Sequence, residues 1–198
     1  MEINNPKFSI IIVAYKKYNE LKCLLYSLLA QSYNNFEIIL IHDGVDNKHK
    51  DLFENFENDS RITYLQTPIR HNDWGMSLRN KGIKLAKGEW VINTNDDNYY
   101  TPNWLEELSK HTDNSINFIY YDAILSHHNL LNHNKKDYGL LIPKVKGCHI
   151  DMGQFAIKKD IIKEHKFKSV APADSELIEE VKHKLVTNYI NKVLFVHN

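Results

Sequence analysis

Two adjacent aspartates, Asp96 and Asp97, are the residues best suited to chemistry in this sequence. They follow the apolar run Glu89 to Asn93 and precede a tyrosine-rich turn. Neighbouring carboxylates repel each other, so such a pair is comfortable chiefly beside a hard divalent cation or a hydroxyl-rich ligand. Mg²⁺ is typically held by one or two carboxylates together with substrate phosphates. An ordinary turn is the competing interpretation, because Asn and Asp favour turns.

Two other apolar runs end in residues that could bind a ligand. The run Phe8 to Ala14 leads into Tyr15, and the run Phe36 to Ile41 leads into His42-Asp43-Gly44. Continuous β-branched runs are typical of strands buried on both faces of a parallel sheet. Ligands of open α/β sheets bind beyond the carboxyl ends of the strands. We therefore expect these two strand ends and the aspartate pair to meet at one edge of a sheet.

Helices are predicted between the strands of the first half. Leucines from Leu21 to Leu29 recur at helical spacing after Asn19. A second helix, ending near Gly88, is predicted to bury one face made of Trp74, Leu78, Gly82 and Leu85. With Arg61 to Leu65 as a further strand, the alternation predicts an α/β sandwich whose central sheet is mostly parallel and flanked by helices.

The pattern loosens after residue 112. Thr101 and Pro102 favour the N-cap and first residue of a helix that precedes this point. No linker or internal repeat is found, so we expect one domain over residues 1–198, with residues 1–112 binding a nucleotide and residues 113–198 an acceptor. The later elements are predicted as strands at Asn117 to Ala123, Gly153 to Ile157 and Val193 to Val196, and helices at Asp160 to His165 and around Leu177 to Leu185.

The composition argues against several classes of protein. Lys plus Arg equals Asp plus Glu at 25 each, and the basic residues are scattered, so nucleic acid is not an expected partner. Cys23 and Cys148 lack metal-ligand spacing and suggest a reducing compartment. Residues 1–8 lack a signal-peptide pattern, and no apolar run approaches the roughly 20 residues of a membrane helix. A cytoplasmic protein without a transmembrane segment is therefore expected, and a homodimer is left open.

Several segments occur in the order and spacing that resemble family 2 glycosyltransferases, which have the GT-A fold. They are SIIIVAY, LLAQSYNNFEIILIHDG, RNKGIKLAKGEWV and NDDNYYTPNWL, and they cover roughly residues 8–108. The resemblance implies a nucleotide-diphosphate sugar donor, for which UDP is the expected nucleotide. It also implies inverting transfer to an acceptor hydroxyl, with the acceptor being a glycan, lipid, protein or small molecule.

The resemblance assigns the nucleotide and metal sites to the strand ends. Val13 and Tyr15 match positions that contact the base, and Asp43 matches one that binds the base or ribose. Asp96 is expected to approach the ribose. Asp97 is expected to ligate a Mn²⁺ or Mg²⁺ ion that bridges the diphosphate.

The remaining assignments lie elsewhere in the chain. Arg79 occupies an Arg-Asn position that supports the donor, although a solvated helix residue is the alternative. Asp174 is expected to be the general base, with Glu176 as its substitute and helix capping as the competing role. The resemblance also suggests Asp151 as an acceptor-side acid and His197 as a residue near the metal or diphosphate.

Three positions depart from the usual family pattern. Lys16 stands where Asn is common, His42 begins the segment that is usually Asp-Asp-Gly-Ser, and Asn95 replaces the first acid of Asp-x-Asp. Two other classes of protein are alternatives. A nucleotidyltransferase would need a glycine-rich loop after the first strand, which residues 15–18 lack. A non-catalytic nucleotide-sugar-binding module stays open.

Overall fold

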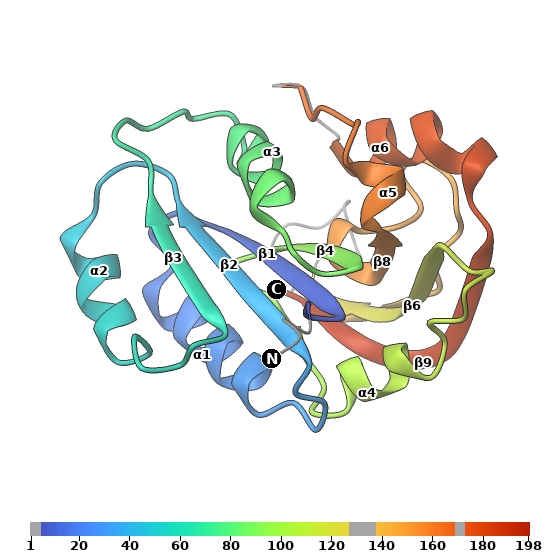
Figure 1. The fold of residues 1–198 in the computed structure, drawn as a ribbon, viewed down its shortest axis with the longest axis horizontal. Helices are drawn as coiled ribbons and strands as arrows, with labels where there is room; N and C mark the ends of the chain where they lie inside the picture. The colour runs from blue at the N-terminus through green and yellow to red at the C-terminus, as the bar shows by residue number, and fades with distance from the viewer. Residues whose placement is uncertain (1–4, 127–137, 169–172) are drawn as a thin grey trace.

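The computed structural model describes residues 5–126, 138–168 and 173–198 (Figure 1). Strands and helices alternate in the first half: β1 (Phe8–Ala14), α1 (Tyr18–Leu29), β2 (Phe36–His42), α2 (Asn47–Glu54), β3 (Ile62–Gln66), α3 (Met76–Leu85) and β4 (Trp90–Asn95). The second half contains β5 (Tyr99–Tyr100), α4 (Trp104–Ser109), β6 (Phe118–Leu125), β7 (Gly139–Leu141), η1 (Met152–Gln154), β8 (Phe155–Lys158), α5 (Lys159–Ile162), α6 (Ala173–Val181), η2 (Lys182–Lys184) and β9 (Thr187–His197).

The described strands join one mixed sheet in the order β3-β2-β1-β4-β8-β6-β9-β5, with β7 paired to β6. The segment from β3 to β4 is parallel, as its continuous apolar runs predict. β8 then runs antiparallel to both β4 and β6, and β5 and β7 are antiparallel to their partners. The α/β prediction is confirmed, but the sheet is mostly parallel only in its N-terminal half.

Successive side chains of β1 point to opposite faces of the sheet, so both of its faces are apolar. Helices pack against each face. Ile10 and Ile12 belong to the core cluster that includes side chains of α1 and α4. Ile11 belongs to the second cluster, which includes side chains of α3, α5 and α6. Figure 1 shows α1 and α2 on one side of the sheet and α3, α5 and α6 on the other. Both cores are therefore built around the same central strand.

Local predictions fail at several places. Trp74 precedes α3 instead of lying on its buried face, and it is 85% exposed. α4 begins at Trp104, three residues after the predicted cap Thr101. Helix α2, which Asp46 caps by accepting the His49 N–H, was not predicted. Leu185 follows η2 and lies outside α6.

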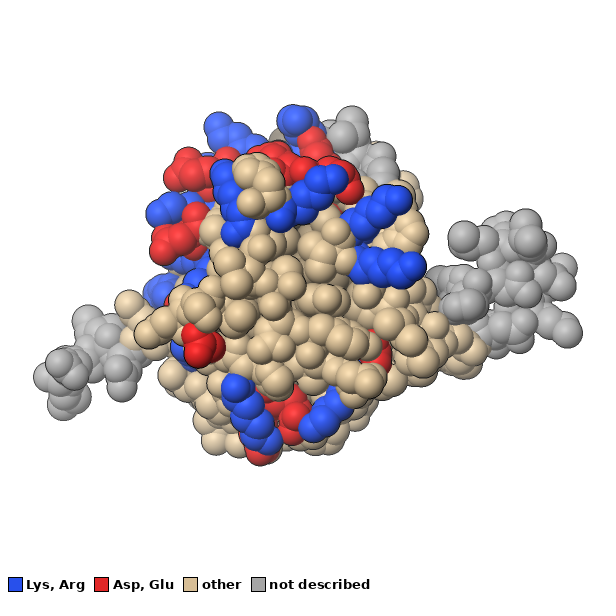
Figure 2. All heavy atoms as spheres, turned by 90° about the vertical axis from the view of Figure 1, so that its right-hand side faces the viewer, with Lys and Arg blue, Asp and Glu red and all other residues tan. Residues whose placement is uncertain are grey.

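One side of the molecule carries its charges at the margins. Figure 2 shows this side, the right-hand side of Figure 1, where Lys, Arg, Asp and Glu gather toward the top and bottom. A broad zone with few charged residues lies between them. Among the described helices, none has both the length and the apolar character required to cross a bilayer.

Candidate functional site

A cavity of about 430 Å³ opens at the carboxyl ends of β1, β2 and β4. β2 and β4 are the two parallel neighbours of β1, so the three strand ends predicted to meet lie side by side. Asp43 and Asp97 consequently face the same cavity. Its described lining consists of Val13, Ala14, Tyr15, Lys17, Asp43, Arg70, Asn72, Trp74, Gly75, Leu78, Arg79, Asn95, Asp96 and Asp97.

Asp96 is buried in the turn after β4 and joins this turn to the end of β1. Its Oδ2 accepts the N–H of Tyr15, with a nitrogen–oxygen distance of 2.7 Å. Burial, together with the charge of Asp97, raises the pKa of Asp96 from 3.8 to about 7, although the hydrogen bond from Tyr15 opposes the shift. A nearby cation or hydroxyl donor would favour the ionised form of this carboxyl group.

Asp97 has one carboxylate oxygen available for a ligand. Its Oδ2 pairs with Nζ of Lys17, whereas its Oδ1 is buried and has no hydrogen-bond partner within the described residues. A buried polar atom without a partner costs free energy, so a ligand at this oxygen would be stabilising. Mg²⁺ and Mn²⁺ both prefer oxygen ligands, and the free Oδ1 suits either ion.

Asp43 fastens a loop over the cavity. Its Oδ1 accepts the N–H of His71 at 2.8 Å, and its Oδ2 accepts the N–H of Asn72 at 3.0 Å. The same loop places the guanidinium carbon of Arg70 3.9 Å from the ring centroid of Tyr15, a cation–π contact. Each carboxylate oxygen has two lone pairs, so Asp43 keeps acceptor capacity for a ligand while it holds this loop.

Arg79 is buried, which rules out the alternative of a solvated helix residue. Its Nη2 donates to Oδ1 of Asn95 at 2.6 Å, while Nε and Nη1 have no partner in the described part of the chain. Burial lowers the pKa of Arg79 to about 10, and the charges of Asp151, Asp174, Asp73 and Asp96 oppose this shift. Arg79 is therefore a buried cation within electrostatic range of acids from both halves of the chain.

The reversed direction of β8 brings a second group of residues to this edge of the sheet. Because β8 is antiparallel to β4, the segment before it lies at the carboxyl end of β4. Asp151 in this segment accepts the N–H of Gly153 at 2.8 Å and caps η1. Its Oδ2 lies 3.7 Å from Nε2 of His197 at the end of β9. Asp151 and His197 are neighbours, and neither is among the described lining residues of the cavity.

Asp174 lies in the first turn of α6 and also outside the described lining. Burial raises its pKa, and the charge of Asp151 contributes, although the Ser175 N–H and Arg79 oppose the shift. A raised pKa makes a carboxylate a stronger base. Glu176, its proposed substitute, forms an ion pair with Lys168 at 2.9 Å, so it is less available.

Sequence reasoning did not assign several cavity residues to the site, among them Lys17, Arg70, Asn72 and Trp74. Trp74 adopts a left-handed φ of 57°, and the next residue, Gly75, has a φ of 81°. The left-handed backbone at Gly75 favours glycine, and a Cβ there would also lie 2.9 Å from Nη1 of Arg79. Asp73 accepts the N–H of Ser77 at 2.9 Å, and this capping signal could have placed the helix start after Trp74.

The architecture is that of GT-A glycosyltransferases, as comparison with solved structures shows. TarS from S. aureus, solved also with UDP and with UDP-GlcNAc, aligns with a TM-score of 0.79 over 97% of this chain and 60% of its own, at 16% identity. The mannosyltransferase PcManGT from Pyrobaculum calidifontis, solved with GDP-Man and Mn²⁺, aligns with a TM-score of 0.73 over 98% of this chain and 57% of its own, at 13% identity.

Residues 9–164 match the sequence model described as Glycosyl transferase family 2, so the chain belongs to this family. An uncharacterized glycosyltransferase from Haemophilus influenzae is 26% identical over 94% of this chain and 78% of its own length. Three further curated relatives match 54–60% of the chain at 27–32% identity: the putative colanic acid biosynthesis glycosyl transferase WcaA of Escherichia coli, an uncharacterized glycosyltransferase of Rickettsia bellii and the putative glycosyltransferase EpsH of Bacillus subtilis. The chain spans only 16–38% of the length of these three proteins.

Proposed function

We propose that this chain transfers a sugar from a nucleotide-diphosphate donor, a UDP-sugar, to an acceptor hydroxyl with inversion and with the help of Mn²⁺ or Mg²⁺. The observation that carries the proposal is the single cavity lined by Asp43, Asp96 and Asp97. Family membership and the GT-A fold agree with this reaction class. The complexes of TarS with UDP-GlcNAc and of PcManGT with GDP-Man support a nucleotide-sugar donor.

The nucleotide would occupy the part of the cavity between the ends of β1 and β2. Val13 and Tyr15 would contact the base, and the guanidinium group of Arg70 lies over the ring of Tyr15. Asp43 would accept hydrogen bonds from the base or ribose through its remaining lone pairs. Asp96 would accept a hydrogen bond from a ribose hydroxyl. This bond would favour the ionised form of the Asp96 carboxyl group over the protonated form. Donor binding would thus be built mainly from residues at the strand ends of the sheet.

Asp97 would hold the divalent cation through its free Oδ1. When bound, such an ion supplies Lewis-acid stabilisation of the leaving diphosphate. Lys17 would be released from Asp97 as the ion arrives, which leaves its ammonium group free to contact a phosphate oxygen. Arg79, fixed beside Asn95, would add positive potential at the same end of the cavity.

The acceptor would be activated by Asp174, whose raised pKa suits proton abstraction from a hydroxyl. In this proposal residues 1–112 bind the donor and residues 113–198 bind the acceptor within one domain. Asp151 would contribute on the acceptor side, and the assignment of His197 to the metal or diphosphate stays a prediction. Asp174 would take the proton while the hydroxyl oxygen bonds to the anomeric carbon and the bond to the diphosphate breaks.

A thermal-shift and turnover experiment tests the proposal. The purified chain is melted with a panel of nucleotides, with and without Mn²⁺, and nucleotide release from the matching sugar donors is measured. At a ligand concentration of about 100 Kd, a ligand bound only by the folded state adds about 2.7 kcal/mol, which raises Tm by about 5–10 °C. UDP with Mn²⁺ is expected to give this shift, and a UDP-sugar is expected to release UDP slowly.

Three variants separate the roles of the acids. Asp97→Ala should abolish the Mn²⁺-dependent part of the shift, whereas Asp160→Ala, on the surface beside Lys163, should not. Asp174→Asn should keep the shift but lower turnover by about 10²–10⁴-fold. Binding without any release by the wild type would favour a non-catalytic nucleotide-sugar module. Absence of a shift with every nucleotide would refute the proposal.

A further inference from the structure

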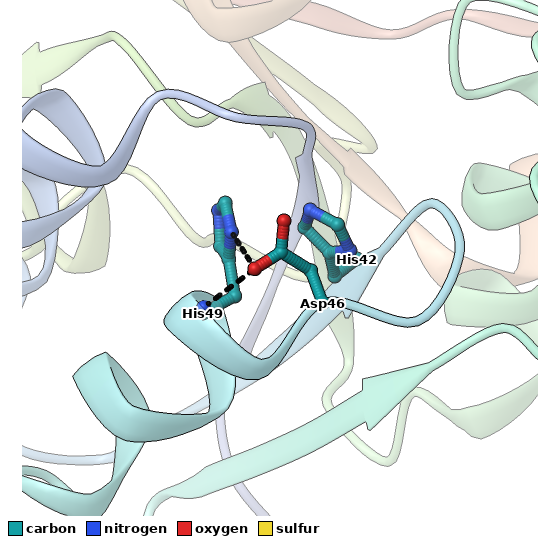
Figure 3. A group of neighbouring side chains, drawn as sticks. All are labelled: His42, Asp46 and His49. Carbon is teal, nitrogen blue, oxygen red and sulfur yellow. Dashed lines mark hydrogen bonds and ion pairs between the residues drawn. The ribbon is translucent and has the colours of Figure 1, made fainter.

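A compact group of two histidines and one aspartate lies outside the described lining of the cavity, and the proposed function does not use it. Figure 3 shows His42 at the end of β2, Asp46 at the start of α2 and His49 in the first turn of that helix, with their side chains converging. One potential ligand atom from each residue lies within 4.8 Å of the other two. Two imidazoles and a carboxylate thus meet at one point between β2 and α2.

Both histidines are buried and have ring nitrogens without partners. His42 and His49 are each only 1% exposed. Nδ1 of His42 lies 2.8 Å from the carbonyl oxygen of Gly44, so Nδ1 carries the proton and Nε2 keeps a lone pair. This Nε2 and both ring nitrogens of His49 have no hydrogen-bond partner among the residues that the structure describes. Buried polar atoms of this kind call for a partner, such as an ordered water molecule, a ligand or an ion.

The carboxylate is held in place by its own hydrogen bonds. Oδ2 of Asp46 accepts the hydroxyl of Tyr18 at 2.9 Å, and Oδ1 accepts the backbone N–H of His49 at 3.1 Å. Oδ1 also lies 3.8 Å from Nδ1 of His49, too far for a direct hydrogen bond. The backbone of Asp46 is fixed further by the side chain of Gln66, which donates to its carbonyl oxygen at 2.6 Å. Surrounding bonds that orient a ligand are typical of metal sites.

We propose that His42, Asp46 and His49 form a site for a transition-metal ion, with Zn²⁺ as the ion that fits best. Neutral imidazoles and one carboxylate suit Zn²⁺, whereas Mg²⁺ prefers an all-oxygen shell. Ligand atoms around a tetrahedral Zn²⁺ lie about 3.4 Å apart for bonds of about 2.1 Å. The observed upper separation of 4.8 Å therefore requires only small side-chain movements to close the site. The fourth ligand would be a water molecule.

The protonation state of His49 agrees with the ligand geometry. Burial and, to a smaller degree, the charge of His42 lower the pKa of His49 to about 4, although the charge of Asp46 opposes them. His49 is therefore neutral at pH 7, which is the form that binds a metal ion. The tautomer of His42 leaves Nε2 as its donor atom to the ion.

The position of this group gives the ion a structural role. His42 directly precedes Asp43, and its ring lies 6.0 Å from the ring of Tyr15 in a stacked arrangement. An ion bound here would tie the end of β2 to the start of α2 and fix the short turn between them. Asp43 begins this turn, so the ion would hold the nucleotide side of the cavity in place. The site is separate from Asp97, which belongs to the turn after β4.

A metal titration of the untagged, chelator-stripped chain tests the proposal. The titration uses the Asp97→Asn background, which removes the carboxylate proposed to bind the donor's metal. We expect one Zn²⁺ per chain by calorimetry and a tetrahedral visible spectrum with Co²⁺. Zn²⁺ at about 100 Kd should raise Tm by about 5–10 °C.

Variants identify the ligands. His49→Gln should weaken Zn²⁺ binding by at least about 100-fold. Asp46→Asn should weaken it by at least about 10-fold and remove the Co²⁺ spectrum, while Asn still caps α2. His149→Gln, at an exposed histidine bonded to Gly147, is the matched control and should change nothing. If His49→Gln does not fold, Asp46→Asn decides the question.

Two results would overturn the inference. The first is a parent protein that takes up no Zn²⁺ at near-stoichiometric concentration. The second is Zn²⁺ binding that persists at full affinity in both His49→Gln and Asp46→Asn. In either case the two rings would be neutral packing groups, in keeping with their centroid distance of 3.9 Å.

Discussion

Replacing Lys17 with methionine tests whether this lysine occupies the charge position of the expected cation. Nζ of Lys17 pairs with Oδ2 of Asp97, and the two side chains are 50% and 10% exposed. Burial is the largest single influence and lowers the pKa of Lys17, but the hydrogen bond to Asp97 and the charges of Asp97, Asp96 and Glu20 together raise it. A cation that binds Asp97 must therefore break this pair. Lys17→Met removes the competitor and shortens the side chain little.

The size of the effect follows from the exposure of the pair. A half-exposed ion pair contributes about 0.2–1 kcal/mol, so Mn²⁺ should bind about 1.5–5-fold more tightly to Lys17→Met than to the wild type without nucleotide. Calorimetry at low salt measures this change, and the difference should shrink in high salt because the pair is partly screened. Lys16→Met makes the same change in net charge beside Tyr15 and serves as the control. Weaker Mn²⁺ binding by Lys17→Met would refute the argument.

Three further predictions concern pH, packing and the cavity rim. The pKa of Asp96 is about 7 in the folded chain and 3.8 in a free one, so the native state binds this proton more tightly. Stability should therefore fall as pH rises from about 4 to 7, and Asp96→Asn should be more stable than the wild type at pH 8 by about 1–4 kcal/mol in urea with EDTA. Gly82→Ala would place a Cβ 2.4 Å from Ile11 and should lower the free energy of unfolding by about 1–3 kcal/mol. Trp74→Ala should change stability by less than about 0.5 kcal/mol but weaken donor binding about 2–12-fold in calorimetry. Equal stability at pH 8, an unchanged urea midpoint or full donor affinity would contradict the respective prediction.

The first half of the fold could be predicted because its signals are local. β1 was predicted with its observed bounds, since a continuous apolar run needs a sheet with both faces covered. The direction of β8 could not be predicted in this way. Its short apolar run satisfies either direction, and pairing with β4 and β6 decides between them. Long-range pairing, which no local pattern encodes, makes the sheet mixed.

The cavity shows the same division between local and long-range information. Asp43 and Asp96 follow strands, so the topology of a parallel sheet places them together. Arg70 and Trp74 belong to a loop whose path depends on hydrogen bonds from His71 and Asn72 to Asp43. Those bonds join residues 28 and 29 positions apart, so sequence spacing alone does not reveal them. Loop residues of the cavity were accordingly the ones missed.

The guanidinium group inside α3 has a consequence for how this protein tolerates sequence change. With a pKa of about 10, Arg79 stays positive at neutral pH, and the negative charges of four acids stabilise its positive charge. Loss of one acid leaves the others to compensate, and the amide at Asn95 still accepts its hydrogen bond. We therefore expect the chain to fold after substitution of one of these acids, even where the substitution impairs sugar transfer.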